Sequence, residues 1–208
     1  MSNTIRVTLG GTLIACVMFT SPANASSPVD LANAAFAPIA GPTSIPVGAA
    51  DFCKRDRQAC APSAHIVEVE ALTQSSWDQL IAVNDDINAT VVPETDEDLY
   101  HVAEYWTYPD GRGDCEDIAL AKQRQLVEDG WDPSTLLMTV VRERDGNGHA
   151  VLMVRTDRGD LVLDNQNGQV LLWKDTDYEY IKRQSQADAG KWVAINDDRA
   201  TIIIAARN

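Results

Sequence analysis

The pattern of apolar residues changes from helical to strand-like at Gly130, and this change limits the chain to a few fold classes. After Gly130, short β-rich runs are separated by turns built from glycine, asparagine and aspartate. The expected strands cover residues 135–141, 149–154, 161–163, 170–173, 191–195 and 201–205. Helices followed by an antiparallel meander predict an α+β domain.

Three helices are expected before this change. Residues 73–88 carry apolar side chains at helical spacing, and Ser75 or Ser76 is the expected cap. A weaker helical pattern covers residues 95–106. The third helix follows a glycine-rich turn, and Asp114 is expected to cap it because an aspartate side chain can accept from free backbone N–H groups.

Residues 1–25 have the pattern of a signal peptide. Arg6 supplies a positive charge, residues 7–19 are apolar but too short to cross a bilayer, and Ala-Asn-Ala at 23–25 fits a cleavage site. The segment therefore predicts export to the periplasm. A lipobox ending at Cys16 is the alternative and would leave a lipid-anchored protein, but the apolar run continues beyond Cys16, which favours cleavage after residue 25.

The cysteines of the exported chain comprise one close pair and one single residue. Cys53 and Cys60 are close in sequence, and an oxidising compartment favours a disulfide between them. A metal pair is the alternative, although no second pair at zinc-like spacing follows. We expect residues 26–62 to form an extended arm fastened by this bridge, and residues 63–208 to form the compact domain. Cys115 is then left as an odd, potentially reactive thiol.

The formal net charge of −14 excludes one class of partner. A strongly acidic surface repels the phosphate backbone, so nucleic acid and an anionic membrane surface are not expected partners. The charge is compatible with cations and with solubility. Oligomeric state is not indicated.

A possible nucleophile lies at the start of the third helix. Cys115 follows the glycine-rich turn, and the positive end of a helix favours the reactive thiolate form of a cysteine. His149 opens a strand, and Asp164 ends the next one, so the two side chains can meet as base and orienting group. The alternative is that Cys115 is a small buried hydrophobic residue.

Three segments carry a resemblance to a known family. They are Gly-Arg-Gly-Asp-Cys-Glu-Asp at 111–117, Gly-His-Ala-Val at 148–151 and Leu-Asp-Asn-Gln at 163–166. Together they resemble the bacterial transglutaminase-like cysteine peptidase family, over residues 50–180. Further matching positions are Asn84, Asn88, Trp106 and Gly130-Trp131. The resemblance implies a papain/transglutaminase-like fold, with the nucleophile helix packed on an antiparallel sheet, and a Cys115–His149–Asp164 triad.

The resemblance also implies a calcium site beside the nucleophile. Asp114, Glu116 and Asp117 match the acidic residues that bind calcium in adhesin-processing members, and Ca²⁺ prefers carboxylate and carbonyl oxygens. Without a cation, three carboxylates would oppose a thiolate. The alternative is that Asp114 caps the helix while Glu116 and Asp117 complement its dipole.

Three functions remain open from the sequence. Characterised members of the resembled family are periplasmic proteases that cleave large surface adhesins and can be sequestered by an inner-membrane receptor for cyclic di-GMP. This implies a cysteine endopeptidase acting on an exported or cell-surface protein. A transglutaminase would use the same triad, and a non-catalytic calcium-responsive module is the third possibility. The arm with Cys53 and Cys60 departs from the best-studied members, which leaves the adhesin substrate open.

Overall fold

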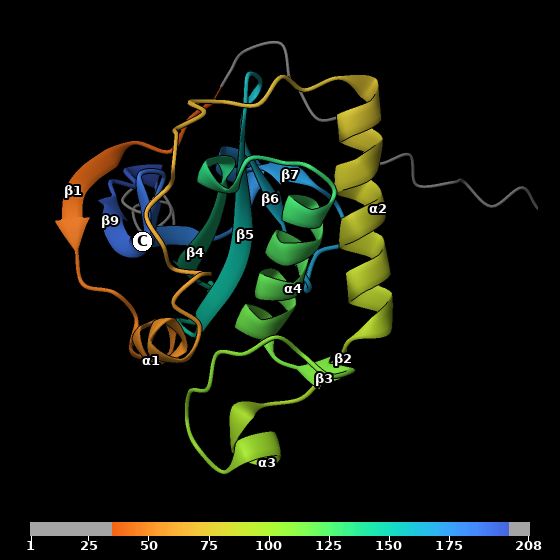
Figure 1. Ribbon diagram of the computed structural model, residues 1–208, viewed down its shortest axis with the longest axis vertical. Helices are drawn as coiled ribbons and strands as arrows, with labels where there is room; N and C mark the ends of the chain where they lie inside the picture. Colours follow the sequence, from red (N-terminus) through yellow and green to blue (C-terminus); the bar gives the residue numbers. More distant parts are fainter. Residues whose placement is uncertain (1–34, 200–208) are drawn as a thin grey trace, which may run out of the picture.

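A seven-stranded antiparallel sheet forms the centre of the computed structural model, which describes residues 35–199 (Figure 1). The strand order is β1-β9-β8-β4-β5-β6-β7. The strands are β1 (Ile39–Thr43), β4 (Leu136–Arg142), β5 (Gly148–Thr156), β6 (Gly159–Leu163), β7 (Leu171–Leu172), β8 (Glu179–Ser185) and β9 (Asp188–Ile195). The predicted α+β class is therefore confirmed.

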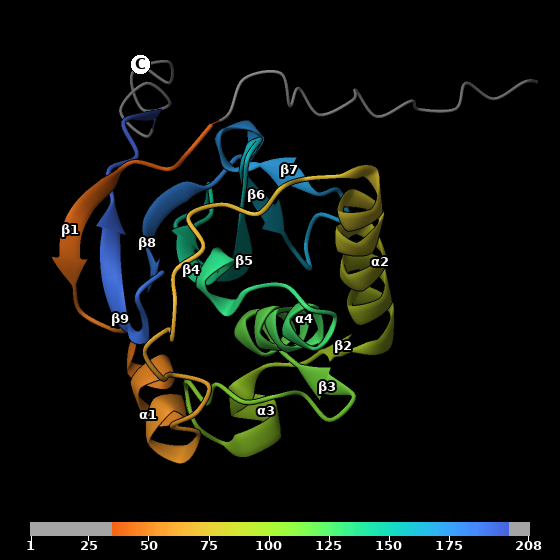
Figure 2. The ribbon, with the colours of Figure 1, turned by 45° about the horizontal axis from the view of Figure 1, so that its top comes forward.

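The helices are α1 (Val47–Arg55), α2 (Gln74–Thr90), α3 (Asp96–Tyr100) and α4 (Cys115–Glu128). Short 3-10 helices cover Pro133–Thr135 and Trp173–Asp175, and β2 (Val92–Pro93) pairs in parallel with β3 (Arg112–Gly113). Helix α4 packs against β5 and α2 flanks α4, whereas α1 and α3 lie near the N-terminal end of α4 (Figures 1 and 2). Within residues 35–199, no helix has the length and apolarity that crossing a bilayer requires.

The central strands are buried on both faces. Alternate residues of β4 and β5, such as Met138 and Leu152, contact the core beneath α4, while their neighbours Leu137 and Val151 belong to a second core on the opposite face. Side chains of a strand point alternately to the two faces, so this division follows from the period of two. The doubly covered sheet gives the strand that carries His149 a rigid support.

Helix α2 begins with a different cap from the predicted one. Thr73 is the N-cap: its hydroxyl accepts from the Ser76 N–H, and the Ser76 hydroxyl accepts from the Thr73 N–H. This reciprocal capping box satisfies two N–H groups at once. Ser76 therefore contributes to the cap as its third helical residue, and Ser75 does not.

The helix predicted over residues 95–106 is shorter than expected. Helix α3 ends at Tyr100, and His101 follows with a left-handed φ of 57°. The chain then turns back, so that the Tyr105 N–H donates to the Asp96 carboxylate instead of continuing the helix. The weak periodicity did not reveal this return.

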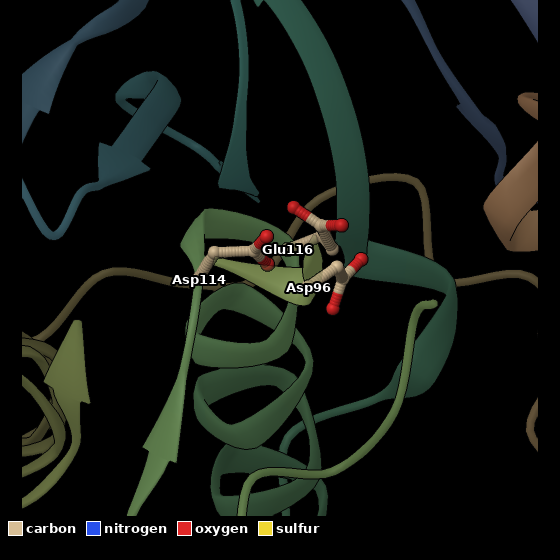
Figure 3. A group of neighbouring side chains, drawn as sticks. All are labelled: Asp96, Asp114 and Glu116. Carbon is tan, nitrogen blue, oxygen red and sulfur yellow. The ribbon is translucent and has the colours of Figure 1, made fainter. Parts of the chain in front are cut away.

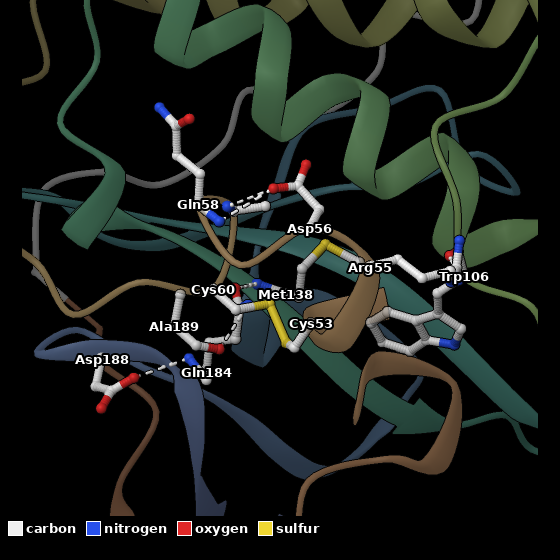
Figure 4. The surroundings of a disulfide bond; sticks show 12 residues. Cys53, Arg55, Asp56, Gln58, Cys60, Trp106, Met138, Gln184, Asp188 and Ala189 are labelled. Carbon is white, nitrogen blue, oxygen red and sulfur yellow. Dashed lines mark hydrogen bonds between the residues drawn. A yellow bond between two sulfur atoms is a disulfide. The ribbon is translucent and has the colours of Figure 1, made fainter. Parts of the chain in front are cut away.

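The arm of residues 26–62 is not extended in its described part. It contains β1, which pairs with β9, and the helix α1, so the sheet begins before the predicted domain boundary at residue 63. The predicted Cys53–Cys60 disulfide is present and fastens the end of α1 (Figure 4). The predicted signal peptide, Cys16 and the expected strand at 201–205 lie outside the described residues.

Candidate active site

Cys115 is the first residue of α4, directly after β3 and its turn. Gly111 has a φ of +73°, which a residue without Cβ adopts at low cost. At Gly113, an added Cβ would lie 2.7 Å from Asp117 Oδ2, so only glycine lets the backbone pass this carboxylate. Asp114 occupies the N-cap position as predicted, but its side chain makes no capping hydrogen bond.

His149 and Asp164 form a buried pair. His149 Nε2 lies 2.9 Å from Asp164 Oδ1, and both residues are less than 5% exposed. The Asp164 carboxylate also accepts from the Gln166 N–H and the Tyr178 hydroxyl. Burial acts to raise the pKa of Asp164, but the hydrogen bonds from His149 and Tyr178 hold it below its ordinary value. An ionised carboxylate can only accept, so Nε2 carries the proton and Nδ1 is left to act as a base.

Cys115 and His149 line the same cavity, which has a volume of about 430 Å³. Its lining residues are Pro46, Val47, Glu104, Trp106, Cys115, Glu116, Val140, Gly148, His149 and Ala150. The Ala150 N–H acts to lower the pKa of the Cys115 thiol. The structure thus places Cys115 of α4 and His149 of β5, the predicted nucleophile and base, on the lining of one cavity.

Helix α1 supplies one wall of this cavity. Gly48 passes so close to the Trp106 indole that an added Cβ would lie 2.3 Å from Cδ1. Arg55 fixes the same segment, because its guanidinium donates to the Trp106 carbonyl at 2.6 Å and stacks on Tyr105. Part of the arm therefore belongs to the site.

The surroundings of the Cys115 thiol disfavour its ionised form. It donates to Glu116 Oε2 at 3.2 Å. Burial and the negative charge of Glu116 raise the pKa of the Cys115 thiol far above its ordinary value, and the Ala150 N–H opposes this only in part. The carboxylates therefore oppose the effect of the helix terminus on the thiol, as their positions in the sequence led us to expect.

Three carboxylates gather at the N-terminal end of α4 (Figure 3). Asp96, Asp114 and Glu116 each place an oxygen within 4.8 Å of the others. One oxygen of Asp96 and one of Asp114 are buried and have no hydrogen-bond partner among residues 35–199. Burial, together with Asp114, raises the pKa of Glu116 to about 9. Clustered, unpartnered carboxylate oxygens fit a hard cation such as Ca²⁺.

The composition of this cluster differs from the predicted metal set. Asp114 and Glu116 are members, but Asp117 is directed elsewhere, and its Oδ1 accepts from the Thr107 N–H at 2.7 Å. Asp96 takes its place from the start of α3. Asp96 was missed because it is distant in sequence, and only the return of the chain at Tyr105 brings it to α4.

The sequence of this chain matches a known protein family. The model of the bacterial transglutaminase-like cysteine proteinases matches residues 39–200. The chain belongs to this family. It is a cysteine peptidase, and the family prediction made from the Cys115 motif is confirmed. No curated protein matches the chain.

Solved structures of Legionella pneumophila LapG resemble this proteinase. One LapG structure is 27% identical, over 63% of this chain and 75% of that chain, with a TM-score of 0.48. An EGTA-treated LapG is also 27% identical, over 60% and 73%, with a TM-score of 0.48. A calcium-bound LapG is 23% identical, over 64% and 81%, with a TM-score of 0.50, and shares the fold.

Proposed function

We propose that this cysteine peptidase is a calcium-dependent endopeptidase of exported proteins, with Cys115 as nucleophile, His149 as base and Asp164 as orienting residue. The contact between His149 Nε2 and Asp164 Oδ1 carries the proposal. It fixes the tautomer whose free nitrogen can take the thiol proton, in a cavity that Cys115 also lines.

The reaction follows from this arrangement. His149 Nδ1 takes the Cys115 proton, and the thiolate attacks the carbonyl carbon of a peptide bond. Backbone N–H groups at the start of α4 are placed to stabilise the oxyanion. The histidine then protonates the leaving amine, and water hydrolyses the thioester to release the second product and the free thiol.

The carboxylate cluster supports the calcium dependence. Asp96, Asp114 and Glu116 would hold the cation, and backbone carbonyls or water would complete the shell. A bound cation supplies positive charge that offsets the carboxylates now favouring the protonated thiol. One of the LapG structures that share the fold is calcium-bound, which agrees with this proposal.

The proposed substrate class rests on the signal-peptide pattern and on the family. The signal-peptide pattern of residues 1–25 supports a periplasmic location, with lipid anchoring at Cys16 as the alternative. The substrate would be an exported or cell-surface protein, and a large adhesin is the candidate that the resemblance suggests. An inner-membrane receptor would be a regulatory partner.

The first test measures the reactivity of Cys115 without a substrate. We expect iodoacetamide to alkylate Cys115 in calcium-containing buffer already well below the ordinary thiol pKa of about 8.5. EGTA and the variant His149→Ala should each slow the reaction. His65→Ala is the matched control, because His65 is an exposed histidine paired with Asp132. An ordinary thiol profile that ignores calcium and His149 would refute the proposal. Incorporation of a fluorescent primary amine into a glutamine-containing protein would instead indicate a transglutaminase.

A further inference from the structure

Two asparagines of α2 hold both ends of the loop that carries Asp164. Asn88 Nδ2 donates to the Asp164 carbonyl at 2.8 Å, and Asn84 Nδ2 donates to the Gly168 carbonyl at 3.0 Å. The two asparagines are four residues apart and so lie on one face of the helix. Residues 164–168 are thereby fastened to α2 at their first and last members.

The asparagine closest to Asp164 has no other hydrogen-bonding role within residues 35–199. The amide oxygen of Asn88 is buried without a partner, so its bond to the Asp164 carbonyl is the only one that its side chain makes there. A buried amide group costs free energy unless it is paired. We therefore assign to Asn88 the role of holding the Asp164 backbone, rather than that of filling space in the core.

Lys122 links this arrangement to the nucleophile helix. It lies on α4, two turns after Cys115, and only 1% of the residue is exposed. Its Nζ donates to Asn84 Oδ1 at 2.8 Å. An ammonium group can only donate, so it fixes the carbonyl end of the Asn84 amide and leaves the NH₂ end directed at Gly168. Lys122 thus determines which way the amide of Asn84 points.

We propose that Asn84, Asn88 and Lys122 are positioning residues that hold the Asp164 loop in register with α4, and through it the ring of His149. This inference rests on the proposed catalytic function. The chain of contacts runs from α4 through Lys122 and Asn84 to the loop, and from Asp164 to His149 on β5. It connects the helix of the nucleophile to the base by a route outside the cavity.

The position of Asp164 leads us to expect a large loss of reactivity when its loop is released. Asp164 follows the last residue of β6, so its backbone lies beyond the ladder that fixes the strand. Displacement of a catalytic group by about 1 Å can cost on the order of 100-fold in rate. Loss of an outer hydrogen-bond partner of a metal ligand typically costs 10- to 100-fold in affinity or activity, and we expect a similar loss of reactivity here.

The test uses the variant Asn88→Ala in the purified protein with calcium. We expect the iodoacetamide rate at Cys115 to fall by about 10-fold or more. The downfield NMR signal of the His149 Nε2 proton, which donates to Asp164, should shift or broaden. Asp86→Ala is the control, since Asp86 is exposed on the same helix and its side chain makes no hydrogen bond within the described residues.

A second variant and a double-mutant cycle separate positioning from folding. Asn88→Ser keeps a small donor and replaces Asn88→Ala in the assay if the latter fails to fold. In the Asp164→Asn background, Asn88→Ala should slow alkylation no further, because its effect passes through Asp164. A normal rate and NMR signal in a folded Asn88 variant, or independent effects in the cycle, would overturn the inference.

Failure of the proposed function gives a different result. In that case the unmodified protein itself would alkylate like an ordinary thiol and would not respond to His149→Ala. If the unmodified protein is activated by His149 and the Asn88 variants match it, the catalytic proposal stands and only the positioning role is refuted.

Discussion

Replacing Asp96 by asparagine should have opposite effects with and without calcium. In EGTA, Asp96→Asn removes one of three clustered carboxylates, so we expect a higher melting temperature than for the unmodified protein. The substitution keeps an oxygen that can accept from the Tyr105 N–H, so the local turn should remain. With calcium, the same variant loses a charged ligand and should gain less stability from the ion.

The size of the calcium-induced stabilisation follows from the coupling between calcium binding and folding. At a calcium concentration of about 100 times the dissociation constant, binding stabilises the native state by about 2.7 kcal/mol. For a domain of this size, that raises the melting temperature by roughly 5–11 °C, at about 2–4 °C per kcal/mol. A tenfold weaker site removes about 1.4 kcal/mol, or roughly 3–6 °C of the calcium-induced rise.

Differential scanning calorimetry in EGTA and in calcium measures both effects. Asp117→Asn is the matched control, because Asp117 is also a buried acidic residue close to the cluster but lies outside it. Its calcium-induced rise should equal that of the unmodified protein. If Asp117→Asn reduces the rise and Asp96→Asn does not, the structural assignment of the ligands is wrong and the assignment from sequence is right.

Two further predictions concern stability. Burial raises the pKa of Glu116 to about 9 and that of Asp117 to about 7. The unfolded chain therefore loses these protons at a lower pH than the folded protein does. In EGTA, the protein should lose stability as the pH rises from about 4 to about 9. Urea unfolding in EGTA across this range tests the sign, and stability that rises throughout the range would contradict it. Gly48→Ala should destabilise the protein by about 1–3 kcal/mol, because its Cβ would overlap the Trp106 indole. Gly168→Ala, which meets no atom within 4 Å, is the control in the same assay.

The sequence can identify a site residue when its neighbours in space are also close to it in the chain or lie across a hairpin. Cys115 follows a turn of its own segment, and His149 pairs with Val141 across the β4–β5 ladder. Local motifs therefore indicated the three residues of the proposed triad. Asp96 depends on an irregular return of the chain, for which no periodic pattern exists.

Strand β8 was missed for a related reason. Its sequence is rich in charged and amide residues, although Arg183 and Gln184 are buried. Gln184 Oε1 accepts from the Met138 N–H at 2.9 Å, close to a register shift between β8 and β4. A polar side chain that satisfies a neighbouring backbone does not produce the apolar alternation by which a strand is recognised.

The pairing of β1 with β9 has a consequence for biosynthesis. These strands are the first and last of the described chain, and Ile39 lies opposite Ile195 in their ladder. Because contacts so distant in sequence form late, β1 has no partner until the ribosome has added β9. The wall that α1 gives to the cavity follows directly after β1. A nascent chain would therefore lack a finished cavity until its last described strand has been made.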